Sequence, residues 1–147
     1  MTETLNHKPI IGFSDTETVK LDFDDASFPF VRYWALRALK WYKLRGFIVL
    51  KSSNECYHVV FDREVSWPEN IRVVAWVTLL SHNKGLLKWF LMQCIKGSST
   101  LRVSPKCEKP SPRIVHRHGK QSQNIKAFLE IRKIIKNIQE MCKNRCY

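Results

Sequence analysis

Two aspartates separated by one residue are the side chains in this sequence best placed to do chemistry. They are Asp22 and Asp24 in the stretch "TVKLDFDD" (residues 18–25), where apolar and polar residues alternate. A period of two is typical of a strand buried on one face, so both carboxylates should share the other face. Close carboxylates repel each other unless a proton or a cation intervenes, and hard divalent metals take oxygen ligands of this kind. The spacing therefore predicts a Mg²⁺ or Mn²⁺ site.

Two more polar residues are predicted on the same open sheet face. His58 in "CYHVVF" (56–61) and Arg102 in "STLRVS" (99–104) both alternate with bulky apolar neighbours. A histidine and an arginine can contact a triphosphate whose oxygens a metal clamps. Asp22 and Asp24 are then the metal ligands of a phosphoryl-transfer site, and His58 and Arg102 hold the nucleotide. The alternative is an exposed strand face that simply carries polar residues.

The elements that would position these side chains follow in the order strand, helix, strand, strand, helices, strand. Ser27 can cap the first helix and Gly46 can end it, while Ser66 and Glu69 form a capping-box pattern before the second. The expected ranges are a strand at 18–24, a helix at 27–45, a hairpin at 47–61, a helix ending near 80, a well-buried helix at 84–96 and a strand at 99–104. This order predicts an α+β fold with an RRM-like or ferredoxin-like antiparallel sheet, helices packed on one face and an additional C-terminal helix.

The chain is expected to form a single domain over residues 1–147. Its parts are a loose N-terminal arm (1–16), a core (17–104), a basic Pro-rich segment (105–123) in which "RIVHR" could add an edge strand, and an amphipathic helix (124–146). The apolar stripe of that helix should dock on the sheet, on a protein partner or on a second copy of the chain.

The charge balance points to a polyanionic partner. There are 25 Lys plus Arg residues against 13 Asp plus Glu, a formal net charge of +12, although a merely solubilising surface is the alternative. Single-stranded DNA is the expected ligand, bound electrostatically and with little sequence specificity. The residues expected to bind it are Lys106, Lys109, Arg113, Arg117 and Lys120.

Other features of the sequence restrict where the protein works. No apolar segment resembles a signal peptide or reaches the roughly 20 residues of a membrane span, which predicts a cytoplasmic protein without a membrane partner. The five cysteines are odd in number and scattered, so we expect mostly reduced thiols. Cys142 and Cys146 could pair or bind zinc, but the tail offers no further zinc ligands.

Two short motifs extend this hypothesis. "VKLDFDD" followed by "LKSSNECYHVVF" resembles the first two motifs of the archaeo-eukaryotic primase superfamily, a hydrophobic strand ending in Asp-x-Asp and a later Ser-containing turn that leads into a strand with His. The resemblance implies an RRM-like palm, a catalytic metal on Asp22 and Asp24, nucleotide contact by His58, and a role in DNA replication as a DNA-directed primase or nucleotidyltransferase. The family's third motif carries another metal-binding Asp, whereas "SSTLRVSPK" contains no carboxylate. The resemblance is thus to a minimal or degenerate member.

Two other hypotheses remain open. His116 and His118 in "IVHRHG" are spaced as in rolling-circle replication initiators, which also need a tyrosine nucleophile, and only Tyr147 lies downstream. The remaining hypothesis is a non-catalytic RRM-like module that binds single-stranded nucleic acid or a replication partner, with most of the five tryptophans buried in the core.

Overall fold

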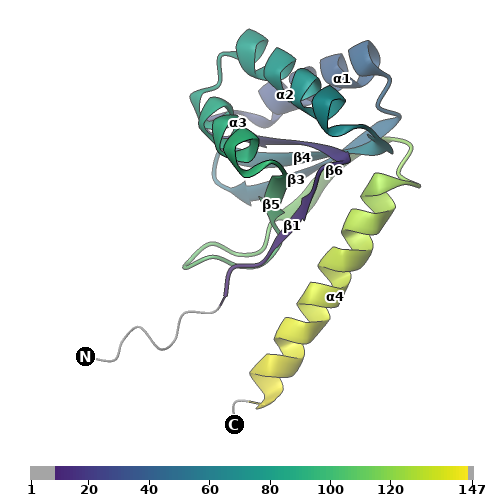
Figure 1. Cartoon of the computed structure of the whole chain (residues 1–147). Coiled ribbons are helices and arrows are strands. Elements are labelled where there is room, and N and C mark those ends of the chain that lie inside the picture. Colours follow the sequence, from purple (N-terminus) through teal and green to yellow (C-terminus); the bar gives the residue numbers. More distant parts are fainter. Residues whose placement is uncertain (1–8, 146–147) are drawn as a thin grey trace.

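The computed structural model describes residues 9–145, with side chains to residue 142. The elements follow in the order β1 (Gly12–Asp15), β2 (Thr18–Phe23), α1 (Phe28–Tyr42), β3 (Gly46–Ser53), β4 (Cys56–Glu64), α2 (Trp67–Ser81), α3 (Lys84–Lys96), β5 (Ser99–Arg102), β6 (Arg113–Gly119) and α4 (Asn124–Arg145). Figure 1 shows helices above and below a central sheet. The predicted α+β class and the antiparallel pairing are confirmed.

The central sheet has four strands in the order β2–β4–β3–β6, and every neighbouring pair is antiparallel. Strand β4 lies between β2 and β3, so β2 and β3 run parallel and α1 connects them across one face. The predicted hairpin of β3 and β4 is present, with Asn54 and Glu55 at its turn. The segment "RIVHR" belongs to β6, which forms the sheet edge beside β3 as expected.

Helices α1 and α2 cover one face of the sheet, and their first turns form where the sequence predicts. Ser27 Oγ accepts a hydrogen bond from the Phe30 amide at 3.3 Å, and Ser66 Oγ accepts one from the Glu69 amide at 3.3 Å. These caps satisfy amides that have no partner within the helix. The predicted stop of α1 at Gly46 is wrong, because Lys43 ends the helix in a left-handed conformation (φ 52°). The main core is the contact between these helices and the inward residues of the sheet, among them Val19, Leu21, Phe23, Phe47, Val59, Phe61, Val31, Ala35, Val73 and Val77.

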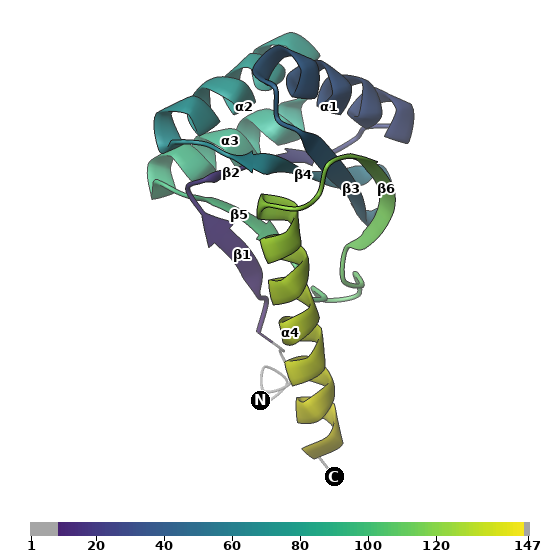
Figure 2. The same cartoon turned by 90° about the vertical axis from the view of Figure 1, so that its right-hand side faces the viewer.

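The other face of the sheet is not open, contrary to our expectation. Ile48, Leu50 and Val60 are fully or almost fully buried there. They pack against Phe13 and Leu101 of the β1–β5 pair and against Ile125 and Phe128 of α4, as a second core. Figure 2 shows β1, β5 and the start of α4 beneath the sheet. Burying large apolar residues on both faces is favourable, so only the end of this face that carries polar residues stays open.

Strands β1 and β5 form their own two-stranded antiparallel ribbon, with Gly12 opposite Arg102 and Asp15 opposite Ser99. The expectation of a loose arm over 1–16 is therefore wrong for Gly12–Asp15, and residues 1–8 lie outside the described part. The expectation that β5 completes the main sheet is also wrong. Lys20 joins the ribbon to β2: its fully buried amine donates to Asp15 Oδ1 at 2.5 Å and to Ser99 Oγ at 2.8 Å.

The start of α4 is fixed by a carboxylate from β4. Asp62, which is fully buried, accepts hydrogen bonds from the amides of Ser122, Gln123 and Ile125 at 2.9–3.2 Å. Arg45 lies on its other side, with Nε 3.5 Å from Oδ2. The predicted C-terminal helix is confirmed to Arg145. Its second half extends away from the body in Figures 1 and 2.

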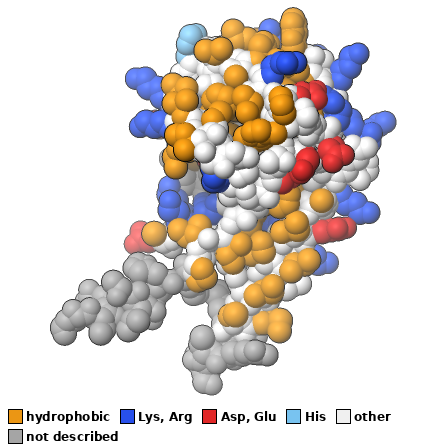
Figure 3. All heavy atoms as spheres, viewed as in Figure 1, with side chains coloured by type: hydrophobic (Ala, Val, Ile, Leu, Met, Phe, Trp, Pro, Cys, Tyr) orange, Lys and Arg blue, Asp and Glu red, His pale blue; other side chains and the backbone are white. Residues whose placement is uncertain are grey.

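Helix α3 has the predicted bounds but not the predicted burial. Only Leu86 and Gln93 are buried, whereas Leu87, Leu91, Met92 and Ile95 are exposed. Figure 3 shows hydrophobic side chains gathered over this part of the surface and along α4. The reason is position: α3 packs beside α2 and contacts β2 and β5 at the rim of the sheet, so one side of the helix has no protein neighbour. In the described residues no helix is long and apolar enough to span a membrane, and Cys56, Cys94, Cys107 and Cys142 are free thiols.

Candidate functional site

A cavity of about 310 Å³ opens at the polar end of the second sheet face. It lies where the end of β2, the β3–β4 hairpin, β5 and the loop 103–112 come together. Its lining includes all four residues that the sequence predicts for a phosphoryl-transfer site, together with two of the predicted nucleic-acid-binding lysines. The lining residues are Ile10, Asp22, Asp24, Ser52, Ser53, Cys56, His58, Arg102, Lys106 and Lys109.

Asp22 and His58 face each other across neighbouring strands. They are register partners of β2 and β4, and His58 Nε2 lies 3.6 Å from Asp22 Oδ1. Burial, reinforced by the nearby Asp24 charge, raises the pKa of Asp22 to about 7. Burial, with Arg102 adding to it, lowers the pKa of His58 to about 3. At neutral pH the contact therefore joins a neutral imidazole and a carboxyl group that is about half protonated, so it is not a full ion pair.

Asp24 lies just beyond the end of β2, against the N-terminus of α3. Asn83 caps α3 by accepting a hydrogen bond from the Leu86 amide at 2.9 Å, and its side-chain amide donates to the Asp24 carbonyl at 2.7 Å. A Cβ atom at Gly85 would lie 2.4 Å from Asp24 Cβ and 2.8 Å from Asp24 Oδ2. The absence of a side chain at Gly85 therefore creates the space that Asp24 occupies. The positive end of the α3 dipole favours a carboxylate there.

Arg102 is held by the backbone of the protein itself. Its Nη1 donates to the carbonyls of Ser104 and Pro110, the latter at 3.0 Å, and its Nη2 donates to the Ser52 carbonyl at 3.4 Å. These contacts tie both ends of the loop 103–112 to the β3–β4 hairpin. The structure thus shows Arg102 as an anchor for this loop, with three of its five N–H donors directed at backbone carbonyls.

The anchored loop places two lysines at the mouth of the cavity. Lys106 and Lys109 exchange backbone hydrogen bonds at 2.9 and 2.7 Å, which closes a tight turn over Cys107 and Glu108. Both lysines are exposed and line the cavity. The positive charge of Lys109 also opposes the rise in the pKa of Asp22, so it acts on the carboxyl pair. Two mobile cations beside two carboxylates suit an anion that is bound together with a metal ion.

The donor set at the cavity fits a metal that takes part of its coordination from a ligand. In the described range 9–145, no cluster of three or more His, Cys, Asp or Glu side chains is arranged to hold a metal. Mg²⁺, however, is commonly bound through one or two carboxylates, with waters and substrate phosphates completing the octahedron. Asp22 and Asp24 meet that requirement. Asp22 is also a carboxyl group whose negative charge the protein leaves poorly compensated, as its raised pKa indicates.

The other predicted basic residues lie elsewhere. Arg113 and Arg117 are exposed on β6 and Lys120 follows that strand, outside the lining of the cavity. Arg117 donates to Gln121 at 2.8 Å. The structure therefore divides the predicted nucleic-acid-binding set between the cavity mouth and the sheet edge.

The two histidines of "IVHRHG" pack against aromatic rings of the protein. His118 stacks on Phe47 with ring centroids 5.2 Å apart, and His116 lies edge-on to Phe28 at 5.5 Å. Burial lowers the pKa of His116, and Arg32 and His118 lower it further. Tyr147, the tyrosine required by the rolling-circle hypothesis, lies outside the described residues.

Sequence reasoning assigned no role in the site to Ile10, Ser52, Ser53 or Cys56. Ser53 and Cys56 are register partners across the hairpin, and Ser52 Oγ donates to the Cys56 carbonyl at 3.3 Å. Cys56 and His58 are two residues apart on β4, so their side chains lie on the same face of the sheet. Pairing β3 with β4 across the hairpin turn would therefore have placed Ser52 and Ser53 beside the cavity. Ile10 had no comparable signal.

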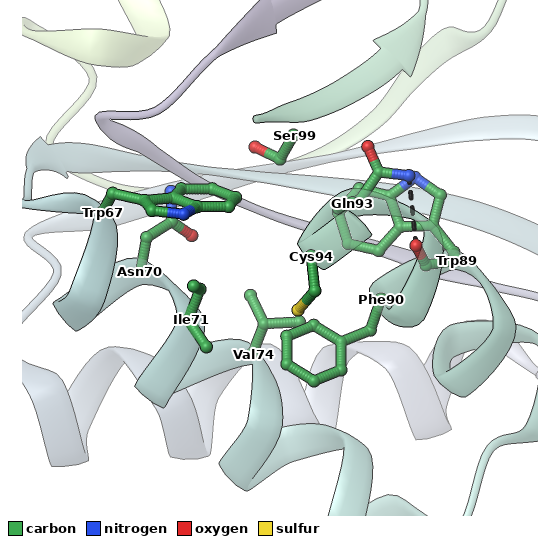
Figure 4. Close-up of a pocket in the computed structure, with 9 residues that line it drawn as sticks. All are labelled: Trp67, Asn70, Ile71, Val74, Trp89, Phe90, Gln93, Cys94 and Ser99. Carbon is green, nitrogen blue, oxygen red and sulfur yellow. Dashed lines mark hydrogen bonds between the residues drawn. The ribbon is translucent and has the colours of Figure 1, made fainter. Parts of the chain in front are cut away.

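A second hollow lies between α2 and α3 and measures only about 10 Å³. Figure 4 shows Trp67, Val74 and Phe90 around it, with Gln93 turned back to donate a hydrogen bond to the Trp89 carbonyl at 3.1 Å. A space of this size holds about one water molecule. It is a packing defect between two helices and offers no room for a substrate.

Comparison with protein-family models, curated proteins and solved structures finds no match to this chain. The cavity must therefore be interpreted from its own geometry.

Proposed function

We propose that this protein is a replication-associated nucleic-acid-binding protein with a primase-like palm, and that its cavity binds a divalent metal together with a nucleoside triphosphate. Asp22 and Asp24 bind the Mg²⁺ or Mn²⁺, and His58 contacts the nucleotide. Lys106 and Lys109 neutralise its phosphates, while Arg102 holds the loop that carries them. When bound, the metal would supply charge stabilisation for a nucleotidyl transfer.

One observation carries the proposal: two carboxylates, a buried neutral histidine and two lysines, far apart in the sequence, line a single cavity. Charges of both signs in one hollow have no value for solubility, and the raised pKa of Asp22 shows that its charge is costly there. Perturbed titratable groups in a cavity are typical of functional sites.

The arrangement of β2, α1, β3 and β4 supports an RRM-like palm as the finer description of the fold. In such a fold two parallel strands, joined by a helix, enclose an antiparallel strand that follows them in the chain. Here Asp22 comes from β2, Asp24 follows the end of that strand and His58 comes from β4, with Asp22 and His58 on the face opposite α1. The β1–β5 ribbon then occupies the side of β2 where a fourth palm strand is expected.

The deciding experiment is primer synthesis on single-stranded DNA with nucleoside triphosphates and Mn²⁺. The wild type should give product, and Asp22→Asn and Asp24→Asn should each abolish it. Asp25→Asn is the matched control, because Asp25 is exposed, lies outside the cavity lining and has φ 48°, which asparagine tolerates. Equal loss of product in the Asp25 variant would contradict the assignment.

The second candidate is a non-catalytic module that binds single-stranded DNA or a replication partner. It is favoured by the donor set itself, since among the described residues Asp22 and Asp24 are the only acidic side chains in the cavity lining, and three Arg102 hydrogen bonds already go to backbone carbonyls. Calorimetry with Mn²⁺ and a non-hydrolysable triphosphate separates the two candidates. Metal-dependent triphosphate binding that Asp24→Asn removes supports the enzyme, whereas metal-independent DNA binding without triphosphate binding supports the module.

A further inference from the structure

Helix α1 displays two large aromatic side chains to solvent, on the side of the sheet opposite the cavity. Tyr33 is 50% exposed and Trp41 is 66% exposed. They are eight residues apart, so their positions are about 12 Å apart along the helix and about 80° apart around it, with residue 37 midway. We expected most tryptophans to be buried, and Trp41 departs from that expectation.

Both rings are held in place by neighbours that leave part of their surface open. Trp41 stacks on Trp76 of α2, with ring centroids 5.8 Å apart and an angle of 15° between the ring planes. Tyr33 lies edge-on to Trp34, at 5.1 Å and 88°. Rings fixed in this way lose little conformational entropy when a ligand stacks on them.

A cation lies between the two rings. Arg37 is one helical turn from each, its guanidinium is 5.6 Å from the centre of the Tyr33 ring, and its Nη1 donates to Tyr33 Oη at 2.9 Å. Arg32 and Lys40 are also exposed on α1, and the helix contains no acidic residue. This surface therefore alternates aromatic rings with uncompensated positive charge.

We infer that Tyr33, Arg37 and Trp41 form a binding strip for single-stranded nucleic acid, separate from the cavity. Bases stack on Tyr33 and Trp41, and Arg37 with its basic neighbours neutralises the phosphates between them. The rise of about 12 Å along the helix between positions 33 and 41 exceeds the stacked-base rise of roughly 3.4 Å, so the strip holds bases of an extended strand. A duplex, whose bases are stacked and paired, cannot use it.

The charge pattern distinguishes this ligand from an apolar protein surface. Protein interfaces are enriched in Tyr, Trp and Arg but depleted in Lys, so the distinguishing feature here is the excess of positive charge: Arg32, Arg37 and Lys40 are exposed on a helix without an acidic residue. The exposed aliphatic residues of the described chain lie on α2 (Leu79 and Leu80), α3 and α4 and at Ile10 and Val115, and none of them lies on α1. A polyanion with flat apolar rings matches both features of the strip.

The test is a titration of the full chain with oligo(dT). Binding is monitored by the quenching of tryptophan fluorescence and, separately, by the fluorescence anisotropy of a labelled strand. Trp41→Ala and Tyr33→Ala should each weaken binding by roughly tenfold, and Trp41→Phe should restore most of the loss. Arg37→Gln should weaken binding less at high salt than at low salt, because it removes one phosphate contact. Ile95→Ala is the matched control for a change at an exposed helical residue.

Binding at the strip should not depend on the lysines at the mouth of the cavity. A Lys106→Ala/Lys109→Ala variant should retain the Trp41-dependent quenching even if its total affinity falls. Circular dichroism and thermal melting of each variant check that α1 and α2 stay packed. Unchanged affinity in both Tyr33→Ala and Trp41→Ala, or equally tight binding of duplex DNA to the strip, would overturn the inference and leave a protein partner as the ligand.

Discussion

Asp22 shows how a single carboxyl group can link the cavity to the stability of the whole chain. Its pKa is raised to about 7 because it lies in a poorly hydrated position beside Asp24. In the unfolded chain it should titrate near the ordinary value of 3.8. At pH values between these two pKa values, Asp22 is mostly protonated in the folded state and mostly ionised in the unfolded state.

This difference gives the first prediction, a loss of stability as the pH rises. The Asp22 contribution is fully present below about pH 4 and declines until about pH 7, by at most about 4 kcal/mol. Asp22→Asn, which stays neutral, should remove this slope from the free energy of unfolding measured by urea denaturation across the same range. Asp25→Asn should retain the slope, and an unchanged slope in Asp22→Asn would contradict the assignment.

The second prediction concerns Gly85, whose missing side chain gives Asp24 its space. Gly85→Ala should force Asp24 away, since the added methyl group would lie 2.4 Å from Asp24 Cβ. Because the clash is with Cβ, the backbone at Asp24 must shift, so the melting temperature should fall despite the helix propensity of alanine, and Mn²⁺ affinity should fall by roughly tenfold or more. Lys84→Ala, in the same turn, is the control. Equal Mn²⁺ affinity in both variants would show that Asp24 does not bind the metal.

At this scale the sequence predicted which four side chains meet in one cavity, and their roles in binding stay predictions. The period of two on separate strands was enough to bring Asp22, Asp24, His58 and Arg102 to one cavity, because strand faces are set by the buried residues. The engagement of Arg102 with three carbonyls could not be foreseen. It depends on the path of the loop 103–112, and loops carry no periodic signal.

At the scale of elements, Ile11 and Arg132 fix the two ends of this loop, at Ser104 and Pro112, and Arg102 ties its tip at 105–110 to the body. Arg102→Ala should release the tip, because the contacts to Ser104, Pro110 and Ser52 are lost together. We expect faster trypsin cleavage after Lys106 and roughly tenfold weaker triphosphate binding, with Mn²⁺ affinity nearly unchanged. Arg102→Lys should recover little, since an ammonium group lacks the planar fork of donors. Arg113→Ala is the control, and slow cleavage in Arg102→Ala would show that the tip of the loop has another anchor.

The attachment of α4 gives the fourth prediction. Asp62→Ala removes the acceptor of three backbone amides and the partner of Arg45. The loss should cost roughly 3 kcal/mol in the free energy of unfolding. Hydrogen exchange should rise first in residues 122–128. Glu64→Ala, an exposed neighbour on β4, should leave both measurements unchanged, and undisturbed exchange in Asp62→Ala would contradict the capping role.

At the scale of the whole molecule, α4 leaves an apolar edge beyond the body. Ile131, Ile134, Ile138 and Met141 are exposed and spaced three, four and three residues apart. That spacing is typical of a helix that meets another helix, so the prediction of a protein partner or a second copy of the chain stays a prediction, and the second copy can be tested directly. Sedimentation velocity should show a concentration-dependent dimer that Ile134→Lys/Ile138→Lys abolishes. A monomer at all concentrations would contradict a second copy as the partner.

The overall architecture was predictable in its core and less so at its rim. Local periodicity and caps gave α1, β3, β4, α2 and α4 close to their observed bounds, because those elements bury one regular face. The ribbon of β1 and β5 was missed because Gly12–Asp15 is too short to show a period and its partner is 84 or more residues away. The exposure of α3 was missed because its composition does not reveal which neighbours it lacks.

The buried amine of Lys20 can also serve as a built-in reporter of how the molecule opens. It lies between β2 and the ribbon, fully shielded and bonded to Asp15 and Ser99. Burial also lowers the pKa of this amine. The neutral amine, which is the form that an acylating reagent attacks, is therefore easier to reach than for a surface lysine. An acylating reagent followed by peptide mass analysis should therefore modify the surface lysines within seconds and Lys20 only at the rate at which the ribbon detaches. Acylation of this one lysine would time the opening of the second core, in which the ribbon residues Phe13 and Leu101 pack against the sheet and α4.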